Sequence, residues 1–417
     1  MSDEGMLSPY RALDLTDEKG LLCGKILGDL GADVIMIEHP LGNPARRLGP
    51  FHHDIPDSEN SLYWFAYDTN KRGITLDIEK ADGRKLFKRL VERTDFVIES
   101  FKPGYMESLG LGYEELEKIN PGIIMTSITP FGPGGPYRDY KESDLVLMSL
   151  GGLTYISGEP DRPPLRITYP QAYLLSGAYA AVGSMMAFYY RGMTGEGQYV
   201  DVSMQECCEW ASYFTPEWWD MAQTNLIRAG MWRVFGPAKM RMVYPCKNGY
   251  VSCWILAGPV ASRGQKRLVE WMDREGMCPD WLRELDFKAW DIFSLGEATQ
   301  EFLDGMAQAF TDFFLTKTKE ELFEFARESE LFLAPMSTAK DLFENPQLKA
   351  RDFWVEVQHP ELGATITYPG AFLKSTVASP SIRRRAPLIG EHNEEIYIGE
   401  LGLPKETLRL LRGAGVI

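Results

Sequence analysis

The sequence is poor in metal ligands and has no long apolar run. Its 417 residues include five histidines and six cysteines, with no CxxC pair and no HExxH pattern, so no metal site is expected. The scattered cysteines are predicted to be reduced, buried thiols. The N-terminus has no charged-then-apolar leader, and no window of about 18 apolar residues suggests a membrane span. These absences predict a cytosolic protein that does not enter a membrane.

Positive charge is also scarce. Lys and Arg number 44 against 59 Asp and Glu, for a net charge of −15 at pH 7. Nucleic-acid binding depends on neutralising phosphates with Lys and Arg, so this composition argues against a broad nucleic-acid surface. An anionic ligand would need a local basic pocket.

The length and the 44% apolar content are sufficient for two domains of ordinary size. The pattern indicates a large α/β domain whose N-terminal part is 1–225, a small α+β domain at 226–325, and a linker and return to the large domain at 326–417. In the small domain, strand-like runs from Met242 to Ile255 surround a hairpin turn at Lys247-Asn248-Gly249, and a helical period covers Phe310–Phe325.

The first third of the chain alternates strand and helix patterns. An apolar run at Ala12–Leu15 precedes a segment of helical period at Gly20–Gly31 and an apolar strand that ends at Pro40. Such a βαβ unit implies a parallel sheet with a right-handed crossover. No GxGxxG motif is present, so the dinucleotide fingerprint is missing. Arg46 and Arg47 lie in the loop where such a sheet usually opens its ligand crevice.

The same order repeats further along. Gly73–Ile78 alternates as a strand, Gly83–Arg93 has a helical period, and Phe96–Ile98 is the next strand. These patterns predict a Rossmann-like parallel sheet.

Many ordered segments resemble the class III coenzyme A transferases, the family of formyl-CoA and carnitine-CoA transferases. The segments include DLGADVIMIEHPLGNPARRLGP, NKRGITLDIEKADGRKLFKRLVERTDFVIESFKPG, TGEGQYVDVS, APMSTAKDLFENPQLKARDFW and APLIGEHNEEI. The resemblance covers nearly the whole chain. It implies a Rossmann-like large domain plus a smaller α+β domain, with two chains interlocked as an obligate dimer.

The resemblance also implies that coenzyme A lies across the strand ends as a substrate, with no covalently bound cofactor. Phe101 and Lys141 match family positions, whereas His39, Glu79 and Ser108 stand where relatives carry cations. The candidates for contacting coenzyme A in this chain are Lys19, His39, Arg46, Phe101, Lys102 and Lys141. Further cations that could compensate are Arg47, Lys71 and Arg72. The alternative is that these are solvated surface charges, the usual state of a single Lys or Arg.

The segment from Pro163 to Ser203 corresponds to the family's nucleophile segment, in which an aspartate stands four residues before a helix glycine. Aligned on Gly177, this chain has Tyr173 at the nucleophile position, which we expect at the entrance of a helix that begins near Ala172. The family chemistry needs a carboxylate, because the acyl group leaves its thioester for the enzyme carboxylate and coenzyme A then attacks the resulting anhydride. A phenol with a pKa of about 10 is a poor substitute. No catalytic residue is therefore assigned to this chain.

Asp201 and Glu206 are the other carboxylates near this segment, but both fit the family pattern away from the nucleophile position. The more economical interpretation is that the chain is the non-nucleophilic subunit of a two-subunit transferase, with the aspartate on a paralogous partner. It resembles the aspartate-lacking subunit in enzymes such as succinyl-CoA:(R)-benzylsuccinate CoA-transferase, which implies succinyl-CoA as donor and an aromatic dicarboxylate as acceptor.

Two alternatives remain open. The chain could be a homodimeric CoA-binding or scaffold protein without transfer activity, or a homodimeric enzyme that uses Tyr173 or a displaced carboxylate.

Two further features bear on the site. An aromatic cluster could line an acid pocket, form a subunit contact or pack in the core; its members are Trp210, Tyr213, Phe214, Trp218, Trp219 and Trp232. The segment AGPVASRG, Ala257–Gly264, stands where relatives carry a glycine-rich lid, but its two glycines make that role doubtful.

Overall fold

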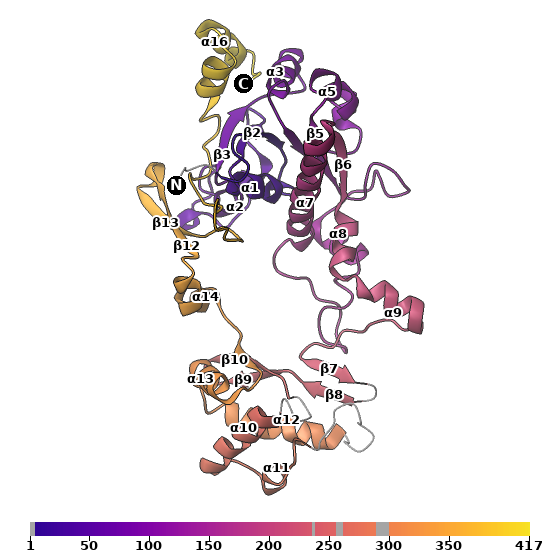
Figure 1. The fold of residues 1–417 in the computed structure, drawn as a ribbon, viewed down its shortest axis with the longest axis vertical. Helices are drawn as coiled ribbons and strands as arrows, with labels where there is room; N and C mark the ends of the chain where they lie inside the picture. Colours follow the sequence, from indigo (N-terminus) through magenta and orange to yellow (C-terminus); the bar gives the residue numbers. More distant parts are fainter. Residues whose placement is uncertain (1–4, 236–237, 256–261, 289–299) are drawn as a thin grey trace. The chain divides into compact units, whose positions relative to one another are not determined.

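The computed structural model describes residues 5–235, 238–255, 262–288 and 300–417 (Figure 1). The chain divides into two compact units. The first comprises Met1–Thr154, Arg166–Asn225 and Gln347–Ile417, and the second Tyr155–Leu165 and Leu226–Pro346. The second unit continues past residue 325, because β11 (Leu333–Pro335) pairs with β10 (Gly249–Cys253) in antiparallel fashion.

A six-stranded parallel sheet is the centre of the first unit. Its order is β3-β2-β1-β4-β5-β6, and every neighbouring pair is parallel. The strands are β1 Arg11–Leu15, β2 Asp33–Glu38, β3 Lys71–Thr75, β4 Phe96–Glu99, β5 Ile124–Thr129 and β6 Gln198–Ser203. The predicted Rossmann-like α/β fold is confirmed. The strand order reverses between β1 and β4, so the carboxyl ends of these strands form the crevice in which α/β proteins of this type bind ligands.

Helices cover both faces of this sheet, with α1 and α7 on one face and α3 and α16 on the other. The helices of the first unit are α1 Leu21–Asp29, α2 Leu62–Tyr67, α3 Ala81–Val91, α4 Tyr105–Ser108, α5 Tyr113–Ile119, α6 Asp144–Leu150, α7 Gln171–Thr194, α8 Met204–Ala211, α9 Phe214–Ala222, α15 Pro346–Ala350 and α16 Lys405–Gly413. Short 3₁₀ turns occur at Pro44–Arg47, His52–Asp54 and Pro360–Leu362, a wider helical turn at Glu395–Glu400, and an antiparallel pair at β12 Trp354–His359 and β13 Ala364–Pro369.

Side chains alternate between the two faces of the sheet along each strand, so the apolar core of the first unit forms two clusters. Ala12 and Val34 pack with α1 and α7, whereas their neighbours Leu13 and Ile35 pack with α3 and α16. Because successive strand side chains point to opposite faces, a run of apolar residues buries both faces at once. This explains why the strands read as nearly continuous apolar runs.

The second unit mixes short strands and helices. Its elements are β7 Trp232–Phe235, β8 Ala238–Arg241, β9 Val243–Cys246, β10, α10 Ser262–Arg274, α11 Asp280–Arg283, α12 Gln300–Phe314, α13 Lys319–Ser329, β11 and α14 Ala339–Glu344. The predicted hairpin joins β9 and β10. The helical period predicted over 310–325 is confirmed at 310–314 and 319–325 but is interrupted between them, because Thr318 and Glu321 form a capping box that starts α13 after α12 has ended.

All six cysteines are free, and five are buried, in agreement with the expected thiols. Among the described helices, none is long and apolar enough to cross a membrane.

Candidate functional site

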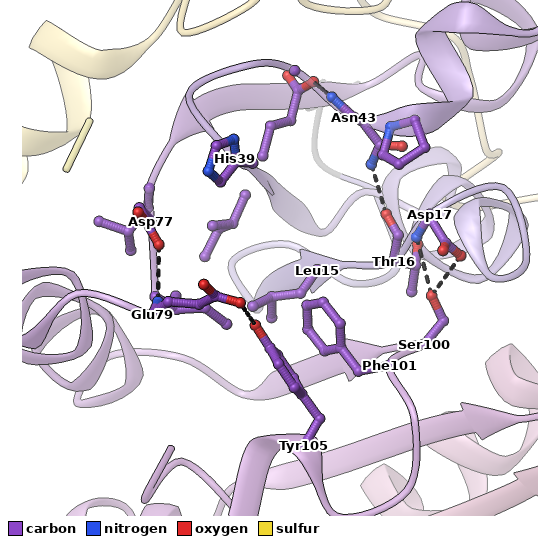
Figure 2. A pocket seen from close by; sticks show the side chains of 16 residues that line it. Leu15, Thr16, Asp17, His39, Asn43, Asp77, Glu79, Ser100, Phe101 and Tyr105 are labelled. Carbon is purple, nitrogen blue, oxygen red and sulfur yellow. Dashed lines mark hydrogen bonds between the residues drawn. The ribbon is translucent and has the colours of Figure 1, made fainter. Parts of the chain in front are cut away.

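A pocket opens at the carboxyl ends of β1, β2, β3 and β4, where the sheet order reverses (Figure 2). Its volume is about 240 Å³. The sixteen lining residues lie at the ends of these strands or in the segments that follow. They are Leu15 at the end of β1 with Thr16 and Asp17 after it, Ile37 and Glu38 at the end of β2 with His39, Gly42, Asn43 and Pro44 after it, Leu76 to Glu79 after β3, and Ser100, Phe101 and Tyr105 after β4. We call this pocket the crevice.

Four carboxylates line the crevice, and none of the sixteen residues is Lys or Arg. The carboxylates are Asp17, Glu38, Asp77 and Glu79. The Tyr105 hydroxyl donates a hydrogen bond to Glu79 Oε1 at 2.8 Å, and the Ser100 hydroxyl donates to Asp17 Oδ1 at 2.9 Å. Figure 2 shows both contacts within the lining. The lining itself therefore carries only negative charge, although relatives are expected to place coenzyme A there. The cations that pair with Asp17, Glu38 and Asp77 lie outside the lining.

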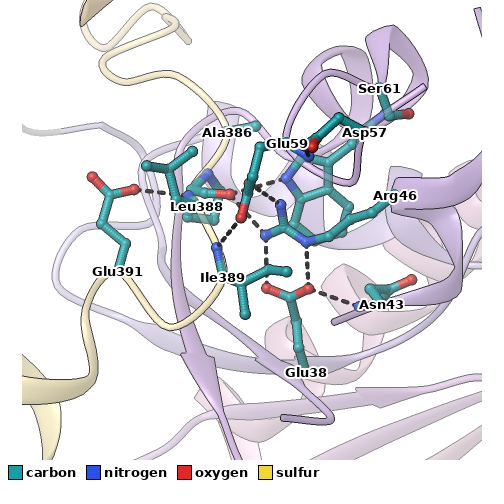
Figure 3. A network of polar contacts seen from close by, with 12 residues as sticks. Glu38, Asn43, Arg46, Asp57, Glu59, Ser61, Ala386, Leu388, Ile389 and Glu391 are labelled. Atoms are coloured by element: carbon teal, nitrogen blue, oxygen red, sulfur yellow. Dashed lines mark hydrogen bonds and ion pairs between the residues drawn. The ribbon is translucent and has the colours of Figure 1, made fainter. Parts of the chain in front are cut away.

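Arg46 lies behind this lining, in a network of its own (Figure 3). Its side chain is fully buried and binds both carboxylate oxygens of Glu38, at 2.6 and 2.8 Å. It also donates to Glu59 and to the carbonyl of Pro387, both at 2.8 Å, and its guanidinium lies 3.9 Å from the centre of the Trp64 ring. These partners occupy the N–H donors of the guanidinium. The contacts of Arg46 thereby connect the loop after β2 to the C-terminal return segment.

The other expected cations are mostly paired or outside the crevice. Lys19 pairs with Asp17. Lys71 is fully buried between Asp14 and Asp68, at 2.9 and 2.8 Å. Arg72 pairs with Asp33, Glu395 and Glu400. Arg47, Lys102 and Lys141 are exposed and do not line the crevice.

Of the six residues expected to contact coenzyme A, the structure thus brings only His39 and Phe101 into the crevice lining. His39 is exposed at the rim, and its Nδ1 accepts a hydrogen bond from the Leu41 amide at 3.1 Å. The ring of Phe101 lies 4.7 Å from that of Tyr105, measured between ring centres.

Glu99 lies beneath the crevice as the last residue of β4. It is 4% exposed, accepts a hydrogen bond from the Phe101 amide at 2.7 Å and a short one from the Ser127 hydroxyl. Burial raises the pKa of this carboxyl to about 7, although both hydrogen bonds favour its charged form. Glu99 is therefore able to hold a proton near neutral pH.

Tyr173 lies within the first turn of α7, because this helix already begins at Gln171. This agrees with the position expected at the entrance of a helix that begins near Ala172. The hydroxyl of Tyr173 donates a hydrogen bond to Glu142 Oε2 at 2.9 Å. Burial and the adjacent Glu142 carboxylate raise the pKa of Tyr173 above its ordinary value. The phenol therefore stays protonated and is not poised as a nucleophile.

Glu142 was not singled out from the sequence. It is separated from Tyr173 by 31 positions, and no local pattern marks it; its position directly after Lys141, a residue that matches the family, is the one available signal. Among the described contacts, the Tyr173 hydroxyl bonds to Glu142 and to neither Asp201 nor Glu206. Asp201 is on β6 and Glu206 in the first turn of α8.

The aromatic cluster does not form a core. Trp210, Tyr213, Phe214, Trp218 and Trp219 are all exposed, and α9 buries none of its residues. Trp232, in β7, is half-buried. Most of the segment AGPVASRG lies outside the described residues.

Comparisons of the sequence and of the structure with known proteins agree on one family. The model of CoA-transferase family III matches residues 7–393. The chain is 37% identical to the succinyl-CoA:(R)-benzylsuccinate CoA-transferase subunit BbsE of Thauera aromatica, over 98% of each chain. It is 28% identical to the succinyl-CoA–L-malate CoA-transferase beta subunit of Chloroflexus aurantiacus, over 95% of this chain and 94% of that one.

Among solved structures, a CAIB/BAIF family protein from Brucella suis has a TM-score of 0.79 at 27% identity and covers 95% of this chain and 99% of its own. The resemblance seen in the sequence is confirmed by these matches, which extend over nearly the full length. The chain belongs to CoA-transferase family III.

Proposed function

We propose that this chain is the non-nucleophilic subunit of a heteromeric CoA-transferase. The complex moves coenzyme A from an acyl-CoA, with succinyl-CoA as the favoured donor, to a carboxylic acid, with an aromatic dicarboxylate such as benzylsuccinate as the favoured acceptor. The observation that carries this proposal is Tyr173, which stands at the family's nucleophile position with its hydroxyl bound to Glu142.

The chemistry of the side chain supports this assignment. Transfer between two acids needs an enzyme carboxylate that alternates between an anhydride and a thioester, and each exchange depends on a good leaving group. A phenol that is held protonated beside a carboxylate neither attacks the thioester readily nor supports that exchange. The nucleophile is accordingly assigned to a paralogous, aspartate-bearing partner.

The names of two relatives support a partner and a substrate class. Both BbsE and the Chloroflexus protein are described as subunits, and both enzymes are named for succinyl-CoA. The first of these enzymes is named for benzylsuccinate, an aromatic dicarboxylate. An interlocked heterodimer, or a tetramer of two such pairs, is the assembly that we propose.

The exposed apolar residues of the first unit are consistent with a partner. Val182, Met186, Tyr189 and Met193 on α7 are between 55% and 71% exposed, as are large aromatic side chains on α8 and α9. Contiguous exposed apolar surface of this kind is typical of protein interfaces.

Trapping of the enzyme-bound acyl group tests the proposal. The complex is purified from its native source through a tag on this chain, incubated with succinyl-CoA and hydroxylamine, and digested for mass analysis. We expect an aspartate-bearing paralogue of similar length in the complex, with the hydroxamate on its aspartate. A hydroxamate on this chain, or full transfer activity of a homodimer of this chain, would contradict the proposal.

Substitution of Tyr173 separates this proposal from the homodimeric enzyme that uses Tyr173. Tyr173→Phe removes one hydrogen bond to Glu142, whose net contribution to stability is about 1 kcal/mol. We expect the turnover of the complex to stay within about twofold of wild type, because such a loss does not touch the reacting groups. Tyr179→Phe on the same helix is the matched control. Abolished turnover in Tyr173→Phe alone would favour catalysis by this chain.

A homodimeric CoA-binding or scaffold protein is the second candidate. It predicts that no aspartate-bearing paralogue co-purifies and that no acyl group is trapped on any chain.

A further inference from the structure

The crevice of this chain has the position of a ligand site but not the charge of a site for coenzyme A. Coenzyme A carries a diphosphate and a further phosphate on its ribose, and proteins bind such groups with Arg, Lys and backbone N–H donors. Here the lining contains four carboxylates and no Lys or Arg among its sixteen residues. We propose that this crevice excludes coenzyme A, through its carboxylates and through the Tyr105–Glu79 hydrogen bond that joins two parts of its lining.

That hydrogen bond joins two parts of the crevice lining that come from different strands (Figure 2). Glu79 follows β3 and Tyr105 follows β4, and β2 and β1 lie between these two strands in the sheet. The contact at 2.8 Å therefore connects the segments that follow the two strands on either side of β2 and β1, next to the strand ends where a ligand of this fold would lie. The remaining volume of about 240 Å³ is below the range of about 300–1,000 Å³ that is typical of sites for drug-sized ligands.

The cations near the crevice are held in other contacts. Arg46 is bound by Glu38 and Glu59, and Lys19 by Asp17. Lys80, which follows Glu79, forms an ion pair with Asp77 at 3.7 Å and donates to the backbone carbonyls of Ala414 and Gly415 at 2.7 and 2.8 Å. A phosphate that entered would meet carboxylates first, and each cation recruited from these pairs would leave a carboxylate unpaired.

Glu79 contributes to both features that we expect to exclude coenzyme A, the negative charge of the lining and the hydrogen bond to Tyr105. Its carboxylate adds negative charge to the lining, and the same carboxylate accepts the hydrogen bond from Tyr105. A lysine at this position would remove the charge and the acceptor together and supply a donor for phosphate.

The consequence for the complex rests on the proposed function. If a partner carries the nucleophile, coenzyme A is held only in the crevice of that partner, so each pair of chains binds one coenzyme A rather than two.

Hydrogen exchange of the complex in its native composition tests the exclusion on this chain itself. Amide exchange is followed in peptides that contain Leu76–Glu79 and Ser100–Tyr105, with and without coenzyme A at about 1 mM, which is the upper end of the usual KM range of about 1 μM–1 mM. In the wild-type complex we expect no protection of these peptides. Protection that saturates with coenzyme A would overturn the proposal.

Three variants then test the role of Glu79. Glu79→Lys is expected to bind coenzyme A at least about tenfold more tightly in this crevice than wild type, a difference of about 1.4 kcal/mol. Glu79→Gln removes the charge at nearly constant size and should shift the apparent Kd in the same direction, by less. Glu92→Lys makes the same charge change at an exposed position after α3 and should change nothing.

Equal gains in Glu79→Lys and Glu92→Lys, or no gain in either Glu79 variant, would overturn the assignment to Glu79. Because protection is read on peptides of this chain, these outcomes are independent of which subunit carries the trapped acyl group.

Discussion

Glu99 shows at the scale of one residue how the fold sets the state of a side chain. The folded protein raises the pKa of its carboxyl from 4.5 to about 7 by burial. Between these two values the folded state holds a proton that the unfolded chain has released. Stability that depends on this group is therefore greatest below about pH 4.5 and is lost as the pH rises through about 7.

The variant Glu99→Gln should remove this dependence. The amide has the shape of the protonated acid, can accept from the Phe101 amide and can donate to the Ser127 hydroxyl, without a charge to bury. At about pH 8 we expect the variant to be more stable than wild type by about 2–3 kcal/mol, and at about pH 5 to differ little. Urea denaturation across this pH range measures the difference.

The control for this measurement is Glu92→Gln, at an exposed position. Its pH profile should match that of wild type. A Glu99→Gln variant that loses stability equally at both pH values would show that the charged form of Glu99 is the favoured one.

At the scale of elements, α7 depends on close contact with α1. A Cβ added at Gly177 would lie 2.9 Å from Cβ of Leu22 and 3.3 Å from the backbone nitrogen of Cys23. Such distances require one helix to move away, since protein interiors are packed without spare space. Gly177 is thus a packing residue within the segment that carries Tyr173.

A matched pair of substitutions on α7 tests this contact. Gly177→Ala should destabilise the protein by about 1–3 kcal/mol through overpacking. Gly192→Ala, where the added Cβ meets nothing within 4 Å, should be neutral or stabilising by up to about 1 kcal/mol, because alanine is the better helix former. Urea denaturation of both variants gives the comparison. Equal changes in the free energy of unfolding for Gly177→Ala and Gly192→Ala would show that the close approach of α7 to α1 does not affect stability.

At the scale of the whole molecule, the first unit presents an apolar groove that is formed by α1, α7 and β6 together with Phe372. Met186 lies in this groove and is 70% exposed. Under the proposed function, the paralogous subunit covers this face.

The substitution Met186→Glu should therefore weaken the complex. Burial of a methionine side chain contributes about 1.5–3 kcal/mol, and a buried unpaired carboxylate costs more, so the apparent Kd should rise by about a hundredfold or more. Light scattering coupled to size-exclusion chromatography measures the assembly. The control is Leu410→Glu on α16, at 68% exposure outside the groove; equal masses for both variants would contradict the assignment of this face.

The amino-acid sequence by itself determined the parallel α/β sheet and the family. Strand and helix periods act over a few residues, so β1, α1 and β2 follow from local pattern. The family motifs are likewise local, and the proposal that Tyr173 stands at the nucleophile position rests on them alone.

Only the tertiary structure decided what the charged residues do. Arg46 is expected from its loop to be available to a ligand, but it binds the carbonyl of Pro387, 341 positions away. Glu79 meets Tyr105 across 26 positions, and Tyr173 meets Glu142 across 31. Which residues pair with a charged side chain depends on their distance in space and on burial, and local sequence patterns encode neither. The acidic character of the crevice is for this reason a property of the fold and is not visible in the composition of any one segment.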